Sequence, residues 1–103
     1  MIKPEFPPGV EIEQVFLVEA QYTVEAPERR PSVRAEHLAR IADLKRAGTV
    51  LEAGAYSDAM TSSIMLLRAD DAEAALAVAR EDVYVRVGVW GEITARPFGR
   101  VST

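Results

Sequence analysis

The chain contains no cysteine, and His37 is the single histidine among its 103 residues. The absence of cysteine excludes disulfide bonds, thiolate metal sites and a cysteine nucleophile. One histidine leaves only carboxylate-rich metal sites, and no group of acids has the spacing of a calcium loop, so we expect no metal site. A chain without cysteine also fits a reducing compartment, and we expect a cytoplasmic protein.

Long apolar runs and uncompensated basic clusters are missing as well. No segment approaches the roughly 18 consecutive apolar residues that a membrane-spanning helix needs. Residues 1–9 lack the apolar centre of a signal peptide. The formal net charge is −4, and both pairs of adjacent basic residues lie close to acids. Nucleic-acid binding needs a basic patch that neutralises phosphates, so we expect neither membrane nor nucleic-acid partners.

The composition is that of a globular protein, with 49% hydrophobic and 27% charged residues. A chain of this length fits one domain. Such a small domain buries only about two-thirds of the surface that its unfolded chain exposes, and association is a common remedy. We therefore expect a homo-oligomer.

The first dozen residues differ in character from the rest. Residues 1–12 carry three prolines and a glycine. Because proline removes backbone donors and fixes φ, we expect an extended arm outside any central strand. Residues 13–22 have an apolar centre rich in strand-forming side chains and predict a buried strand. We place the folded domain at residues 13–103.

An amphipathic helix is predicted from about Glu28 to Ala47. One side of it carries residues at spacings of four, four and three: Val33, His37, Ile41 and Leu44. This is the periodicity of a helix with one face against a core. Pro31 is expected in the first turn, where its missing N–H costs little. Gly48 is expected to end the helix.

The next part of the chain predicts a hairpin and a second helix. Residues 49–56 and 62–69 are expected to be strands, and the short loop between them favours antiparallel pairing. Asp70 or Asp71 is the expected N-cap of the helix that follows.

The end of the chain completes a known topology. Residues 82–88 predict a short extra turn, and residues 89–96 predict a last strand, which we expect Pro97 to close. The order strand, helix, strand, strand, helix, strand is that of the ferredoxin-like split βαβ fold. We expect an α+β protein with its helices on one face of an antiparallel sheet. A second copy of the chain is the simplest cover for the other face, which favours a homodimer.

His37 and Asp58 are the candidate catalytic residues. His37 falls on the packing side of the predicted helix, and Asp58 falls in the loop after a predicted strand. A neutral imidazole is an effective base near pH 7, and a carboxylate bonded to one ring nitrogen fixes its tautomer. We predict that Asp58 orients His37, with the two side chains within about 2.6–3.2 Å. From spacing alone, a single histidine on the apolar face of a helix is more often a packed residue without a chemical role.

Several short motifs follow one another along residues 14–101: Arg34-x-x-His37-Leu38, Gly48, Gly54-Ala55-x-x-Asp58, Asp82-Val83-Tyr84, Gly88 and Arg96-Pro97-Phe98. In this order and spacing the chain resembles the YciI-like (YCII-related) family, within the dimeric α+β barrel group. It differs from the family's pattern at Ala55 and Val83, where proline is usual.

The resemblance implies a dimer with a cleft between the first helix and the sheet, and a His–Asp pair in that cleft. Dehydrochlorination of a chlorinated, hydroxylated aromatic compound has been proposed within the family. Relatives by fold include muconolactone isomerase and cofactor-free monooxygenases. We accordingly expect no cofactor.

Three further residues are candidate substrate contacts. Arg34 lies three residues before His37, and its planar guanidinium suits a carboxylate or phenolate; an ion pair with a nearby acid is an equal alternative. Ser63 can donate to a ligand, although serine also favours turns. Tyr84 can line the cleft or pack in the core, whereas Trp90 favours packing.

These observations favour a small cofactor-independent enzyme of the lyase or isomerase type. A dehydrochlorinase-like reaction is the most specific form of this prediction. It would remove a proton from a small organic acid or aromatic molecule by means of a His–Asp dyad. Two other functions stay open. One is a non-catalytic ligand-binding or regulatory domain that uses the same cleft, and the other is a domain whose function lies in dimerisation.

Overall fold

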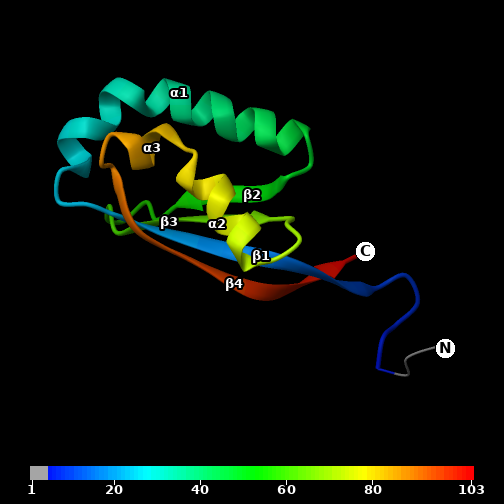
Figure 1. The fold of residues 1–103 in the computed structure, drawn as a ribbon. Coiled ribbons are helices and arrows are strands. Elements are labelled where there is room, and N and C mark those ends of the chain that lie inside the picture. The colour runs from blue at the N-terminus through cyan, green and yellow to red at the C-terminus, as the bar shows by residue number, and fades with distance from the viewer. Residues whose placement is uncertain (1–4) are drawn as a thin grey trace.

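The structure is a computed structural model that describes residues 5–103, and residues 1–4 of the predicted arm lie outside this part. It contains a four-stranded antiparallel sheet with the strand order β2-β3-β1-β4. Helices cover one face of this sheet (Figure 1). The elements are β1 (Glu11–Tyr22), α1 (Ala26–Arg46), β2 (Val50–Ala55), β3 (Ser62–Leu67), α2 (Ala72–Arg80), α3 (Val83–Arg86) and β4 (Trp90–Ser102). The predicted α+β class and ferredoxin-like order are confirmed. No helix in the described part is long and apolar enough to cross a membrane.

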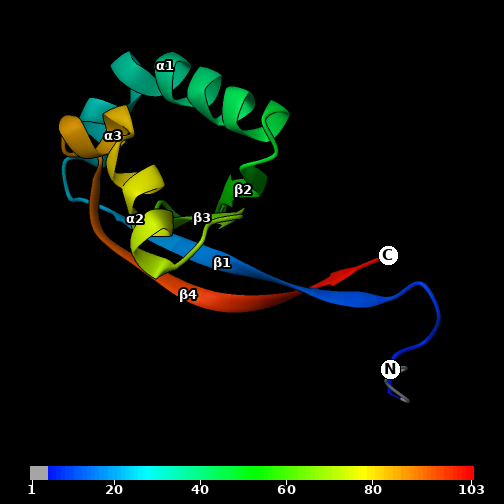
Figure 2. The same cartoon turned by 45° about the vertical axis from the view of Figure 1, so that its right-hand side comes forward.

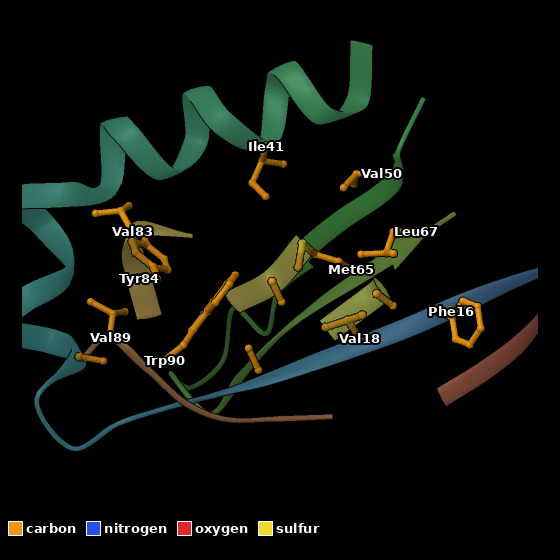
Figure 3. Close-up of a cluster of buried hydrophobic side chains, with 14 residues drawn as sticks. Phe16, Val18, Ile41, Val50, Met65, Leu67, Val83, Tyr84, Val89 and Trp90 are labelled. Carbon is orange, nitrogen blue, oxygen red and sulfur yellow. The ribbon is translucent and has the colours of Figure 1, made fainter. Parts of the chain in front are cut away.

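The core lies between the sheet and the helices, and alternate residues of β1 form its floor. Phe16, Val18 and Ala20 are buried there. Val18 pairs with Met65 of β3, and Ile41 of α1 covers the same side of the sheet (Figure 3). This alternation is the period of two that a strand shows when one face packs against a core.

Helix α1 begins at Ala26, earlier than predicted, and this changes the place of its prolines. Pro27 takes a first-turn position, whereas Pro31 lies inside the helix. A proline at that point offers no N–H to the carbonyl one turn earlier. Figures 1 and 2 show the N-terminal part of α1 turned away from the axis of the rest. The prediction that Pro31 lies in the first turn was wrong, because the proline that starts the helix is Pro27.

The predicted hairpin and second helix are confirmed. Strand β2 pairs antiparallel with β3. Helix α2 begins after Asp71, whose side chain accepts a hydrogen bond from Ala74 N at 2.8 Å, so one N–H of the first turn gains a partner. Ala75 and Ala79 are fully buried. These small side chains let α2 pack closely on β1 and β4.

The last strand is longer than predicted. β4 runs from Trp90 to Ser102 and passes through Pro97, so the prediction that Pro97 closes the strand was wrong. Pro97 lies opposite Phe16, and β4 is at the edge of the sheet, where a residue without an N–H is tolerated. β1 starts at Glu11, inside the predicted arm. Figure 2 shows β1 and β4 running together beyond the rest of the sheet.

The one-turn helix α3 and Gly88 connect α2 to β4, which confirms the predicted extra turn at residues 82–88. Asp82 caps α3 by accepting a hydrogen bond from Tyr84 N at 2.9 Å. Gly88 adopts a φ of +78°, in the left-handed region that a Cβ disfavours. Its carbonyl accepts a hydrogen bond from the hydroxyl of Thr23. This turn therefore joins the segment before α1 to the start of β4.

We expect Gly88→Ala to lower the free energy of unfolding by about 1–2 kcal/mol, because a residue with a Cβ is strained in the left-handed conformation. A Cβ there would also meet the guanidinium of Arg29. Gly54→Ala in β2 is the matched control, since its Cβ would meet nothing within 4 Å. Urea unfolding followed by circular dichroism measures both. An unchanged free energy for Gly88→Ala would contradict the strain.

Candidate functional site

A cavity of about 600 Å³ opens between α1, the β2–β3 hairpin and Tyr84 of α3. The structure brings the predicted site residues to its walls: Arg34, His37, Asp58, Ser63 and Tyr84. The volume lies in the range of small-molecule sites, roughly 300–1,000 Å³. Within residues 5–103 no group of three or more His, Cys, Asp or Glu side chains is arranged to hold a metal ion.

The ring of His37 is held by two aromatic side chains. It stacks on Tyr84 with ring centroids 3.8 Å apart and an interplanar angle of 10°. It also meets Trp90 edge-on, with centroids 5.2 Å apart. His37 is 8% exposed, so packing restricts the ring while one side of it borders the cavity. Trp90 is buried in the core, as expected.

The carboxylate bonded to His37 belongs to Asp82. Nδ1 of His37 lies 2.8 Å from Oδ1 of Asp82, and this corrects the predicted partner, Asp58. Asp58 is exposed in the loop after β2, where it forms part of the cavity wall. No hydrogen bond joins it to His37 in the described part of the chain. Asp82 reaches His37 because α3 places its own N-cap beneath α1. Whether Asp58 has a function at the cavity stays a prediction.

Donors surround the buried carboxylate of Asp82. Tyr84 N donates to Oδ1 at 2.9 Å, and Arg40 Nη1 donates to Oδ2 at 3.0 Å. Burial by itself raises the pKa of such a carboxyl, but the hydrogen bonds from His37, Tyr84 and Arg40 outweigh burial and lower the pKa of Asp82 below its usual value. Asp82 is therefore ionised at neutral pH.

The bond to Asp82 determines which nitrogen of His37 can act as a base. An ionised carboxylate only accepts hydrogen bonds, so Nδ1 carries the hydrogen. In the neutral ring Nε2 is then an acceptor with a free lone pair. Nε2 makes no hydrogen bond within residues 5–103, and the ring lines the cavity. This is the geometry of an oriented base, whose carboxylate also stabilises the imidazolium that forms.

Arg40 is a positioning residue that sequence reasoning missed. While its Nη1 holds Asp82, its Nη2 donates to the carbonyl of Val78 at 2.7 Å. The guanidinium thus links α1 to α2 and to the cap of α3. Arg40 lies three residues after His37, so the two side chains are neighbours on the helix. That spacing was the available signal, but it has meaning only once their shared carboxylate is known.

Ser63 and Arg34 occupy different positions on the cavity wall. Ser63 is buried, and its hydroxyl donates to the carbonyl of Gly54 at 3.2 Å. Its hydrogen is therefore engaged within the hairpin. Arg34 is exposed and has no ion pair within the described residues. Glu36, a nearby acid two residues along α1, pairs with Arg86 at 3.2 Å.

Arg30 and Tyr84 lie close together at the cavity. Burial raises the pKa of the Tyr84 hydroxyl, although Arg30 and Arg34 act in the opposite direction. The hydroxyl is therefore protonated at neutral pH. Arg30 lies over the ring of Tyr22, 5.4 Å from its centroid, in a cation–π arrangement. Sequence reasoning did not single out Arg30, although it lies four residues before Arg34 on the same helix.

Together the fold and the site define a small α+β domain with a carboxylate-bonded histidine beside a cavity. The model of the YCII-related domain matches residues 14–99. The chain belongs to this family, which confirms the resemblance seen in its motifs.

Two related proteins match this chain over nearly their whole lengths. Protein YciI of Escherichia coli O6:H1 is 32% identical over 96 residues, which are 84% of this chain and 98% of that protein. An uncharacterized protein of Haemophilus influenzae is 30% identical over 95 residues, which are 84% of this chain and 97% of that protein.

A solved structure shares the fold. It is the 5-chloro-2-hydroxyhydroquinone dehydrochlorinase from Burkholderia phenoliruptrix in complex with 2,5-dihydroxybenzoquinone. The TM-score is 0.69 at 17% sequence identity, with 82% of this chain and 92% of that chain covered. At this level of identity the likeness establishes the common architecture.

We expect Asp82→Asn to lower the free energy of unfolding at pH 7 by about 3 kcal/mol, because it removes one partner of a buried ion pair. The stabilisation by Asp82 is present above the pKa of an unfolded aspartate, about 3.9. It is lost as the pH falls through the lower folded-state pKa, since the unfolded state then binds the proton more readily. The gap between wild type and variant should narrow below about pH 4.

Urea unfolding at pH 7 and at pH 3 measures this gap. Asp58→Asn is the matched control, because its carboxylate is exposed. It should stay within about 0.5 kcal/mol of wild type at both pH values. Equal effects of the two substitutions at pH 7 would show that the hydrogen bonds of Asp82 do not stabilise the fold.

Proposed function

We propose that the protein is a small cofactor-independent enzyme in which His37 removes a proton from a bound organic acid or hydroxylated aromatic molecule. The observation that carries this proposal is the 2.8 Å hydrogen bond between His37 and Asp82, beside a cavity of about 600 Å³. The bond supplies a fixed tautomer and a partner for the imidazolium. Asp82 takes the orienting role that the sequence predicted for Asp58.

Two reaction types, an elimination and an isomerisation, can begin with proton removal by His37. In an elimination of the dehydrochlorinase type, the substrate reacts as the keto tautomer, in which the carbon that bears chlorine also carries a hydrogen. Nε2 of His37 takes a proton from a hydroxyl or an acidic C–H group of this tautomer. The electron pair left behind forms a new double bond, and chloride departs with the electrons of the C–Cl bond. In an isomerisation, the imidazolium returns the proton to a different atom of the substrate. Asp82 stays hydrogen-bonded to Nδ1 throughout.

Two observations support a small aromatic or acidic substrate. The cavity volume suits a single-ring molecule, and the dehydrochlorinase that shares the fold holds 2,5-dihydroxybenzoquinone in its structure. Fold kinship alone does not transfer a reaction. The substrate therefore has to be found by assay of a panel of hydroxylated and chlorinated aromatic acids.

A ligand-binding or regulatory domain without turnover is the second candidate. The observation in its favour is the packing of His37, which is 8% exposed and stacked on Tyr84. A packed histidine with a satisfied Nδ1 has a structural reason to be present. In this case members of the panel would raise the melting temperature and would not be converted.

We expect His37→Gln to reduce kcat/KM on the converted substrate by about 10²–10⁴-fold, the usual contribution of a general base. Asp82→Asn should also reduce it, because the tautomer of His37 is no longer fixed. Glu36→Gln is the control, since Glu36 is exposed on α1 and does not line the cavity. Product formation is followed by absorbance and by chloride release. Equal turnover by wild type and His37→Gln would remove His37 from the mechanism.

We also propose that the chain forms a homodimer through the sheet face that the helices leave uncovered (Figure 1). Leu17 and Leu66 lie opposite each other on that face and are only partly buried. Phe98 of β4, on the same side, is 42% exposed. Apolar side chains left accessible on one sheet face support such an interface, and a two-fold axis would bring the same face of a second copy against it.

We expect Leu66→Lys to shift the protein towards the monomer, because it places a charge in the centre of the proposed interface. Val24→Lys is the matched control, since Val24 is 93% exposed in the segment before α1. Sedimentation velocity at micromolar concentration measures the masses. A wild-type monomer, or an unchanged dimer in Leu66→Lys, would refute an interface on this face.

A further inference from the structure

Two buried polar groups lie at the cavity. Tyr84 Oη and Arg30 Nε make no hydrogen bond within the described residues. Tyr84 is 1% exposed, and both residues line the cavity. Buried polar groups are nearly always hydrogen-bonded in folded proteins. A guanidinium only donates, and a protonated phenol has a hydrogen to donate. The partner that both groups lack is therefore an acceptor.

The wall formed by α1 is positively charged. Arg30 and Arg34 have no ion pair within residues 5–103, whereas Arg40 of the same helix is bonded to Asp82. The acid among the lining residues is Asp58, which is exposed in the loop across the cavity. Two uncompensated guanidinium groups beside a buried hydroxyl favour a negatively charged acceptor.

The base and the cationic groups face the same space. Arg30, Arg34 and His37 recur at spacings of four and three, which places them on one side of α1, and all three line the cavity. Arg30 is held over the ring of Tyr22 at 5.4 Å. Its guanidinium is therefore positioned before any ligand arrives, which lowers the entropy cost of binding.

We propose that Arg30 and the Tyr84 hydroxyl, with Arg34, form an oxyanion-binding site that selects small planar organic acids and directs their acidic hydrogen towards His37. The proposal rests on the proposed function, because the same cavity holds the base. The flat N–H edge of a guanidinium matches the two oxygens of a carboxylate or of an ionised hydroxyquinone. Such an anion supplies the acceptor that Tyr84 Oη and Arg30 Nε lack.

In this proposal Tyr84 has two roles, one for its ring and one for its hydroxyl. Its ring supports the imidazole of His37 at 3.8 Å, and its hydroxyl binds the anion. A ligand anchored at the hydroxyl is consequently held at a fixed distance from the base. Neutral phenols of the same shape lack the charge that Arg30 and Arg34 recognise, so they bind more weakly.

Isothermal titration calorimetry with three probes tests this site at pH 7.5. The probes are 2,5-dihydroxybenzoate as the carboxylate, 2,5-dihydroxybenzoquinone as the ionised hydroxyquinone, and hydroquinone as the neutral molecule. We expect wild type to bind at least one anion about tenfold more tightly than hydroquinone, the value of one charge-assisted hydrogen bond. The stronger of the two anions identifies which oxyanion the site accepts. Equal affinity for all three probes would overturn the proposal.

The variants separate this site from the general attraction of anions. Arg30→Gln and Tyr84→Phe should each weaken the anion about tenfold and leave hydroquinone unchanged, and Arg30→Lys should restore part of the loss. Arg46→Gln is the matched control, since Arg46 is exposed at the far end of α1 and pairs with Asp43. Unchanged anion affinity in Arg30→Gln would overturn the proposal, even if Tyr84→Phe fails to fold.

His37→Gln distinguishes the two proposals. If it loses turnover but binds the anion as wild type does, both proposals are supported. If wild type binds the anion selectively and converts no member of the panel, the oxyanion site stands and the enzymatic function fails. If wild type shows turnover that Arg30→Gln retains with an unchanged KM, the enzymatic function stands and the oxyanion site fails.

Discussion

The hydrogen bonds of one carboxylate organise both the fold and the site. Asp82 is enclosed by donors from three places: the ring of His37, the guanidinium of Arg40 and the backbone of Tyr84. A buried charge is tolerated only when its hydrogen-bonding capacity is met. The contacts that satisfy Asp82 also cap α3, hold α1 against it and fix the tautomer of His37. The stability of the fold and the orientation of His37 therefore depend on a single set of bonds.

The aromatic side chains give that arrangement its rigidity. His37, Tyr84 and Trp90 contact one another in stacked and edge-on pairs, geometries that aromatic rings prefer. Figure 3 shows Tyr84 and Trp90 at one end of the core, with Ile41 and Met65 towards the other. The site is thus continuous with the core, and the ring of His37 is buried among core side chains. Within the described residues, only its Nε2 edge is left without a hydrogen bond.

Hydrophobic periodicity predicted most of this architecture, because each element shows its buried face in its own sequence. The positions of Pro31 and Pro97 were missed for different reasons. Pro27 competes for the start of α1, and the tolerance of Pro97 depends on β4 being an edge strand, which no local pattern reveals. The partner of His37 was missed because Asp82 lies 45 residues away. Its sequence context predicted a short turn over residues 82–88, which α3 confirms, and could not show the bond to His37.

Pro97 has a consequence for how copies of this chain can meet. An exposed edge strand normally offers a row of N–H and C=O groups on which another strand can add, and this is a route to aggregation. A proline within β4 interrupts that row, since it has no N–H to give to a neighbour. Continuous extension of the sheet from chain to chain is thereby disfavoured along β4. Contact between sheet faces needs no free backbone donors and is unaffected, so the outer edge itself favours closed pairs over open-ended fibres.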